Sequence, residues 1–159
     1  MTSETASNDW SQLQISADNI IHLPSGIFGF EGFKDYVLLE NPAEEPFVWL
    51  QSVDDSNLAF LMIRPEHFTG EYAPEISDRD AESIGLCETG SAIIYSIVTF
   101  QSDGSCYANL KGPLVINMAD LKGRQVVPEN ASEFSLRHRL SPNADLERKE
   151  LTDVGFVTA

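Results

Sequence analysis

The stretch FVWLQSVDDSNLAFLMI, residues 47–63, contains two apolar segments separated by a short polar one. Alternation along the first segment would give a strand with two faces, one carrying Phe47, Trp49, Gln51 and Val53 and the other Val48, Leu50 and Ser52. Both faces are partly apolar, which indicates a strand that is covered on two sides. Asp55-Ser56-Asn57 has the composition of a hairpin turn, so the stretch predicts two antiparallel strands.

The same pattern of short apolar runs between turn-forming residues continues in both directions. Further strands are expected in the runs LQI, IIHL, YVLLE, SAIIYSIVTF, SCYANL, PLVINM and RQVV. Asp103-Gly104 marks a second hairpin, because Gly accepts a positive φ at little cost. One helix is expected where Ser77 can cap and Asp80 follows, running toward Gly85. The sequence therefore predicts an all-β, antiparallel, barrel-like or sandwich-like single domain with one or two short helices.

The predicted domain extends over residues 11–140 of the 159-residue chain, which is long enough to bury a core. Residues 1–10 are polar and predict a disordered leader, and residues 141–159 predict a flexible tail. No signal peptide is recognisable, and no apolar run approaches the roughly 18–20 residues that span a bilayer. Two cysteines, Cys87 and Cys106, are too few for a disulfide framework. We expect a cytoplasmic protein without a membrane partner, and a monomer on its own.

The charge of the chain is strongly negative and unevenly distributed. The net charge is −15, and a field of this sign repels phosphate, which disfavours direct binding of nucleic acid. Between Glu31 and Glu88, fourteen acids are opposed only by Lys34, Arg64 and Arg79. Solubility is one explanation for so many acids, and a cationic protein partner is another.

No local motif supports catalysis, or the binding of a metal or cofactor. The three histidines are scattered, and neither cysteine has another thiol or imidazole at metal-ligand spacing. The glycines of PSGIFGFEG match no nucleotide-binding loop, and no nucleophile elbow is present. Paired acids arise freely in an acid-rich chain, so they carry little weight for acid–base catalysis. A carboxylate-based hydrolase stays as an alternative, and it would need two carboxylates that converge in a deep cleft.

Three segments together resemble a known family. They are LPSGIFGFEGFKDYVLLE (23–40), PFVWLQSVDDSNLAFLMI (46–63), and YANLKGPLVINM (107–118) with the GRQVV that follows. Their motifs and their order are similar to those of the flagellar assembly factor FliW family, over about residues 20–140. Gly112 is a mild departure, because many members carry a small side chain there.

The resemblance implies a barrel-like, mostly antiparallel β protein without catalytic activity. Members of the family bind the translational regulator CsrA, which represses flagellin synthesis by occupying flagellin mRNA, and they also bind flagellin. By resemblance, this chain is expected to switch between those two partners and so to couple the flagellin level to translation. A second interpretation is that the chain is an acidic, chaperone-like binding protein for secreted flagellar subunits and does not regulate CsrA.

The residues expected to serve these roles form two sets. Acids that could face a partner are Glu31, Asp35, Glu44, Glu45, Asp54, Asp55, Glu71, Asp78 and Asp80. Family-motif residues expected to build the scaffold are Gly26, Gly29, Phe30, Trp49, Gln51, Asn109, Pro113 and Asn117.

The scaffold residues carry more specific expectations. The glycines predict turns or bulges, and the two asparagines predict hydrogen-bonded turns or strand ends. The aromatic residues, with Phe28 and Phe33, are expected in the core, and any that is exposed becomes a candidate contact. Pro113 predicts a strand start, a bulge or an edge, and an edge would be open to strand addition by flagellin.

Overall fold

The computed structural model describes residues 19–86 and 92–140. Within them the strands are β1 (Ile21–His22), β2 (Asp35–Glu40), β3 (Phe47–Ser52), β4 (Ala59–Ile63), β5 (Ala92–Phe100), β6 (Cys106–Ala108), β7 (Leu114–Asn117), β8 (Lys122–Gln125) and β9 (His138–Arg139). The helices are α2 (Asp78–Ser83) and the short 3-10 turns η3 (Pro42–Glu44), η4 (Pro65–His67) and η5 (Ala131–Glu133). The predicted leader, the strand LQI, Cys87 and the predicted tail lie outside the described residues.

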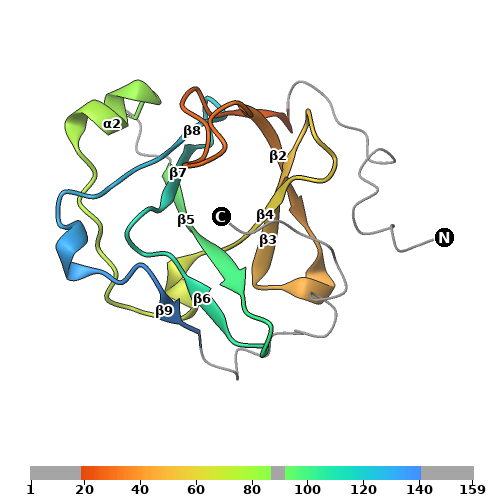
Figure 1. Cartoon of the computed structure of the whole chain (residues 1–159). Helices are drawn as coiled ribbons and strands as arrows, with labels where there is room; N and C mark the ends of the chain where they lie inside the picture. The colour runs from red at the N-terminus through yellow and green to blue at the C-terminus, as the bar shows by residue number, and fades with distance from the viewer. Residues whose placement is uncertain (1–18, 87–91, 141–159) are drawn as a thin grey trace.

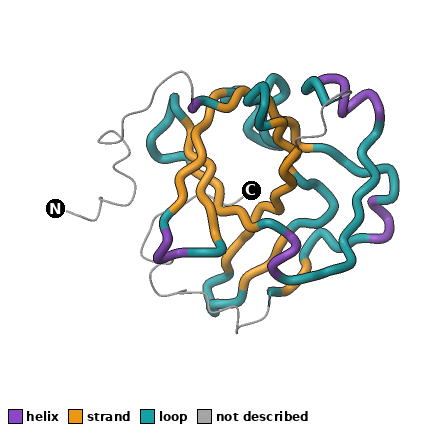
Figure 2. Tube along the Cα trace, turned by 180° about the vertical axis from the view of Figure 1, so that it is seen from behind, coloured by secondary structure: helices purple, strands orange, loops and turns teal. Residues whose placement is uncertain are grey.

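The strands form one sheet that closes on itself. Their hydrogen-bonded order is β4-β3-β2-β1-β8-β7-β5-β6-β9, and β4 also pairs with β5. This extra pairing returns the sheet to its first strand, so the strands surround a common centre (Figure 1, Figure 2). The all-β prediction is confirmed, and we call the closed circuit of paired strands the ring. The exception to antiparallel pairing is the seam between β1 and β8, which is parallel and has His22 opposite Lys122 as its registered pair.

Apolar side chains from six of the nine described strands fill the inside of the ring. This inner cluster includes Ile21, Tyr36, Leu50, Phe60, Ile97 and Leu114, none more than 3% exposed. Each large apolar side chain that is fully buried contributes on the order of 1.5–3 kcal/mol, so the cluster is a main driving force for folding.

Strand β3 is covered on two sides, as its sequence predicts. Leu50 belongs to the inner cluster, whereas Trp49 packs in a separate cluster with its cross-strand neighbour Leu61. Val98 continues this outer cluster onto β5, where it lies opposite Leu61. The stretch 47–63 is therefore a scaffold element with little free surface.

A second outer cluster lies where the end of helix α2 meets β7 and β8. It consists of Ile84, which directly follows α2, Val115 of β7 and Val126, which directly follows β8. Ser77 caps the helix by accepting a hydrogen bond from the Asp80 amide at 3.1 Å, which confirms the predicted start. Arg124 of β8 forms an ion pair with Asp80, with 3.0 Å between Nε and Oδ1, so α2 is attached to the sheet by charge as well as by packing.

Strand β7 is an interior strand, which corrects one expectation. It pairs with β5 on one side and with β8 on the other. Pro113 is buried directly before β7, and its carbonyl accepts the Val126 amide at 3.0 Å. Pro113 is therefore a strand start, and the idea that it marks an edge open to strand addition is wrong.

Candidate protein-interaction surfaces

The glycine-rich loop between β1 and β2 is a tight turn. Gly26 has a φ of +69°, and a Cβ added there would lie 2.6 Å from Glu31 Cα, so a side chain is excluded. Gly29 also has a positive φ, of +90°. Phe30 closes a turn by donating its amide to the Ile27 carbonyl at 2.7 Å. The prediction that these glycines meet backbone requirements is confirmed.

Both family-motif asparagines hold turns. Asn109 Oδ1 accepts the amides of Lys111 at 2.9 Å and Gly112 at 3.0 Å. Asn117 donates from Nδ2 to the Ile84 carbonyl at 2.7 Å, which connects the end of β7 to the end of α2. Their predicted use in turns and at strand ends is confirmed.

Two further family-motif residues, Trp49 and Gln51, are buried and hydrogen-bonded. Trp49 Nε1 donates to Glu44 Oε1 at 3.1 Å, and both side chains are buried. Gln51 Nε2 donates to carbonyl oxygens of the β3–β4 turn, among them that of Leu58 at 3.1 Å. The structure therefore uses Glu44, which was expected to face a partner, as an internal acceptor.

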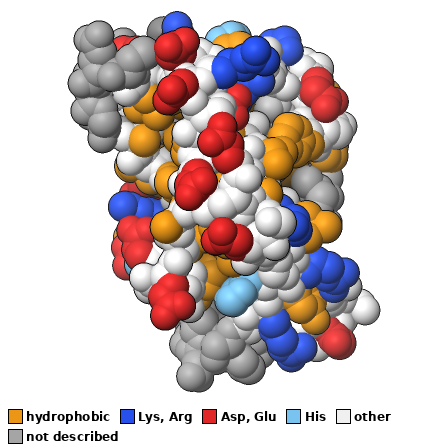
Figure 3. All heavy atoms as spheres, turned by 90° about the vertical axis from the view of Figure 1, so that its left-hand side faces the viewer, with side chains coloured by type: hydrophobic (Ala, Val, Ile, Leu, Met, Phe, Trp, Pro, Cys, Tyr) orange, Lys and Arg blue, Asp and Glu red, His pale blue; other side chains and the backbone are white. Residues whose placement is uncertain are grey.

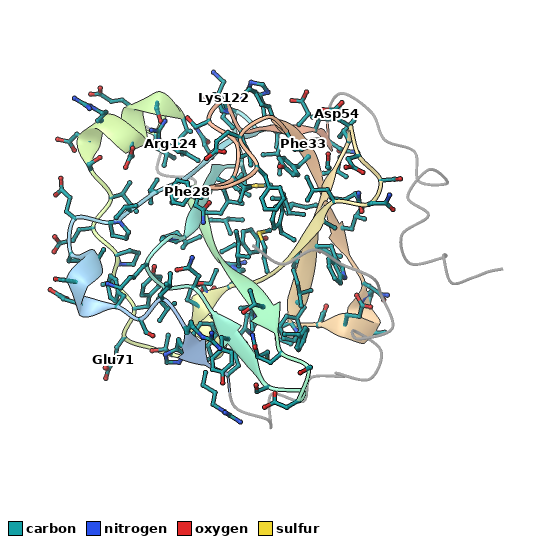
Figure 4. The ribbon with its side chains drawn as sticks, viewed as in Figure 1. Phe28, Phe33, Asp54, Glu71, Lys122 and Arg124 are labelled. Atoms are coloured by element: carbon teal, nitrogen blue, oxygen red, sulfur yellow. The ribbon has the colours of Figure 1, made fainter. Side chains whose placement is uncertain are left out.

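The nine acids expected at a partner surface separate into three groups. One is at the end of the ring formed by the β1–β2 loop and the β3–β4 hairpin: Glu31, Asp35, Asp54 and Asp55. The second is at η3: Glu44 and Glu45. The third is in and before α2: Glu71, Asp78 and Asp80. Figure 4 shows Glu71 and Asp54 toward opposite corners of the molecule, so one small partner surface cannot contact them all.

Acids of the first group already interact with their neighbours. Asp35 Oδ1 lies 2.7 Å from His22 Nδ1. The exposed Glu31 carboxylate accepts the Gly29 amide at 3.1 Å, and this hydrogen bond lowers the pKa of Glu31. Burial, with a smaller contribution from Asp54, raises the pKa of Tyr36 to about 12.

The third group belongs to a larger surface that the sequence did not reveal. Its exposed acids come from two segments and are Glu71, Glu75, Asp78, Glu82, Glu129 and Glu133, which together we call the acidic face. The two segments run side by side, because the Glu129 amide donates to the Glu75 carbonyl at 2.8 Å and the Glu75 amide to Asn130 Oδ1 at 2.9 Å. Acidic side chains gather on this side of the molecule (Figure 3). No local pattern announces a pairing between residues so distant in sequence.

A second surface feature is a hollow of about 520 Å³, which we call the β5–β6 hollow. Its lining includes Ile97, Thr99 and Gln101 in and after β5, and Tyr107 of β6, which lies opposite Thr99. The remaining lining residues are Phe28, Asn109, Gln125, Leu136 and Arg137. None of these lining residues is an acid.

Phe28 stands at the rim of this hollow, against the expectation that it fills the core. Its side chain is 48% exposed, whereas Phe30 and Phe33 pack against the inner cluster. The Phe28 amide donates to Gln125 Oε1 at 2.8 Å, which fixes the loop over β8. By the criterion stated above, Phe28 becomes a candidate contact, and Leu136, which no sequence pattern singled out, joins it.

Neither surface groups its side chains as a metal site would. Across residues 19–86 and 92–140, no three histidine, cysteine, aspartate or glutamate side chains are grouped so that they could hold a metal ion. Over the same ranges, no helix is long and apolar enough to cross a membrane.

Comparison with known proteins gives consistent matches. The FliW protein family model matches residues 4–140. The flagellar assembly factor FliW of Leptospira biflexa is 43% identical over 117 residues, which cover 72% of this chain and 76% of that protein. The FliW of Natranaerobius thermophilus is 38% identical over 133 residues, covering 82% and 87% respectively. A crystal structure of the flagellar assembly factor FliW superposes with a TM-score of 0.75 at 31% identity, covering 82% of this chain and 91% of that one.

Proposed function

This chain belongs to the FliW protein family, and on that premise we propose that it is a cytoplasmic, non-enzymatic flagellar assembly factor that binds two proteins. One partner is the translational regulator CsrA, which the chain antagonises. The other is flagellin, whose accumulation removes the chain from CsrA and restores repression of flagellin mRNA. The chain thereby couples the level of flagellin to its translation.

The acidic face is the observation that carries this proposal. Its six acids are exposed, and the segment 71–83 contains Arg79 as its one base, while residues 128–133 contain none. A protein that binds RNA must present cations to phosphate. An acidic surface attracts such a protein. In the resulting complex, the acidic surface repels the phosphates of incoming RNA.

Charge alone supplies only part of the affinity. An exposed ion pair contributes about 0–1 kcal/mol and is screened by salt. Specificity must therefore come also from shape and apolar contacts next to the charges.

The test measures binding of the full chain to CsrA and to flagellin from the same organism, separately and in competition, at low and high salt. The variant Glu75→Gln/Glu129→Gln/Glu133→Gln removes half of the acidic face. We expect it to weaken CsrA binding by up to roughly tenfold at low salt, and to reduce the displacement of RNA from CsrA.

The matched control is Glu40→Gln/Glu45→Gln/Asp54→Asn, which changes the net charge equally through exposed acids at other places. Equal weakening by both triple variants would show that only net charge matters, and would refute the role of the acidic face. Binding of flagellin without CsrA would favour the chaperone-like alternative. Binding of neither protein would refute the proposed function.

A further inference from the structure

We propose that the β5–β6 hollow is a docking site for a partner segment that carries a large apolar side chain next to carboxylates. This proposal does not depend on the proposed function, and it concerns a surface separate from the acidic face. It rests on apolar exposure, on the sign of the local charge and on the shape of the hollow.

Apolar exposure is concentrated at this hollow. Over the described residues, the exposed large hydrophobic side chains are Phe28, Met118, Val127 and Leu136. Two of these, Phe28 at 48% and Leu136 at 57%, line one depression whose floor includes the buried Ile97. Scattered exposed hydrophobic residues are normal, but grouped ones around a concave surface are typical of binding sites.

The charge around the hollow is opposite to that of the molecule. Arg137 lines it, and its guanidinium stacks over the Tyr107 ring with 4.4 Å between Cζ and the ring centroid. Arg139 Nη1 lies 3.5 Å from the Tyr107 hydroxyl. Within residues 19–86 and 92–140 neither arginine forms an ion pair. Hydrogen bonds from the Ser105 hydroxyl and amide to Oδ1 of the exposed Asp103 carboxylate lower its pKa, with a smaller contribution from Arg139.

This arrangement selects a carboxylate. A guanidinium held over an aromatic ring is preorganised for two parallel hydrogen bonds to a carboxylate. The net charge of −15 disfavours nucleic acid as the source of the anion. The two arginines likewise disfavour a cationic segment, so the hollow and the acidic face should bind partners of opposite charge.

The shape favours a chain segment over an enclosed small molecule. Small-ligand sites bury most of the ligand surface, whereas this hollow has exposed side chains at its rim. The amides of Asn109 and Gln125 are engaged within the fold, since Asn109 accepts two backbone amides and Gln125 Nε2 donates to the Gly112 carbonyl at 2.8 Å. Gln101, an exposed residue of the lining, carries an amide, which can both donate and accept a hydrogen bond as a peptide backbone requires.

The experiment titrates the isotope-labelled full chain with two blocked peptides and follows its amide resonances. One probe is acetyl-Gly-Asp-Leu-Phe-Asp-Leu-Gly-amide, and the other has lysine in place of each aspartate. We expect the acidic probe to shift the amides of Thr99, Gln101 and Leu136, and to bind roughly tenfold more tightly than its lysine counterpart.

Variants assign the two components of binding. Arg137→Gln should remove most of the preference for the acidic probe, and Phe28→Ser should weaken binding of both probes. Arg79→Gln, which removes an exposed cation from α2, is the matched control and should leave binding unchanged. Equal affinity for both probes, or shifts confined to other surfaces, would overturn the proposal.

Two further results would identify another occupant and also overturn it. Shifts of the same amides with increasing protein concentration, without peptide, would mean that a second copy fills the hollow. Shifts of these amides in the free Phe156→Ser variant would mean that the chain's own C-terminal residues fill it.

Discussion

The buried Tyr36 and the half-buried Tyr72 differ in whether their hydroxyl has a partner. The Tyr72 hydroxyl donates to the Leu110 carbonyl at 2.7 Å, whereas that of Tyr36 finds no partner among the described residues. An unpartnered buried polar group destabilises the native state, so Tyr36→Phe should raise the free energy of unfolding by about 1 kcal/mol. Tyr72→Phe should lower it by a similar amount. Urea unfolding of both variants measures this, and a loss of stability in Tyr36→Phe would contradict the assignment.

The same tyrosines make stability sensitive to alkaline pH. Burial raises the pKa of Tyr36 to about 12, and burial also raises the pKa of Tyr72. The pKa of such a phenol is higher in the folded chain than in the unfolded chain, where it is about 10. Its ionisation equilibrium therefore makes its full contribution to the stability of the folded state at pH values below about 10. Its contribution is lost as the pH rises from about 10 toward 12. We expect the parent chain to unfold before Tyr36 ionises in the folded state. Urea titrations over a series of pH values should show that the Tyr36→Phe variant loses less stability over this range than the parent chain does.

Single residues were predictable where backbone geometry decides their role. The turn at Gly26 and the cap at Ser77 follow from local conformation, which the sequence specifies. Glu44 and Phe28 were not predictable, because their positions depend on side-chain hydrogen bonds that no sequence pattern announces. Glu44 is buried through its contact with Trp49, and Phe28 is held at the surface through Gln125.

Among the elements, the β1–β8 seam is the shortest pairing in the ring, with one registered pair. Gly123 of β8 permits it, since a Cβ there would lie 2.7 Å from Leu23 Cδ2 and 3.1 Å from the Val115 carbonyl oxygen. Gly123→Ala should therefore lower the free energy of unfolding by about 1–3 kcal/mol. The His22 amide, which bonds to the Leu121 carbonyl across the seam, should then exchange faster with solvent.

Gly32→Ala is the matched control for the seam. A Cβ at Gly32 meets nothing within 4 Å, and no positive φ is needed there. Its unfolding free energy should stay within about 0.5 kcal/mol of the parent chain. Equal effects of the two substitutions would mean that the seam does not limit stability.

Elements were predictable where their pattern is strong. The strands at residues 36–40, 47–53 and 58–64 follow from apolar runs between turn formers, and β2, β3 and β4 occupy these places. Strand β9 has only His138 and Arg139, and its pairing with β6 is a tertiary contact without periodicity. The 3-10 turns are equally short, so no window of sequence predicts them.

At the scale of the whole molecule, the surfaces depend on which segments the fold brings together. The sequence predicted an acidic block between residues 31 and 88, but the fold distributes the nine candidate acids of that block over three places. The pairing of residues 73–75 with 129–130 then adds acids from another part of the chain. Similarly, the β5–β6 hollow combines the β1–β2 loop with residues beside β9. Such surfaces depend on the topology of the chain, because they join segments that are far apart in the sequence. Local patterns in a single sequence do not show which segments meet.

The acidic face and the β5–β6 hollow should act independently in binding. Within the described residues no hydrogen bond or ion pair joins a residue of one surface to a residue of the other, and perturbations at separate sites add. Glu75→Gln/Glu129→Gln/Glu133→Gln should therefore lower the association rate with CsrA and flatten its salt dependence, because exposed charges mainly steer encounter. The same variant should bind the acidic peptide as tightly as the parent chain does, or slightly more tightly.

Arg137→Gln should show the reverse pattern, with weaker binding of the acidic peptide and little change in the association rate with CsrA. A variant that carries both Arg137→Gln and the triple glutamate substitution should be measured by the same titrations and by stopped-flow association. Its free-energy effects should equal the sum of the separate effects. A departure of more than about 0.5 kcal/mol from that sum would mean that the two surfaces are coupled. Coupling of this kind would let a ligand in the hollow control the cationic partner on the acidic face, which is a different mechanism from direct competition for one surface.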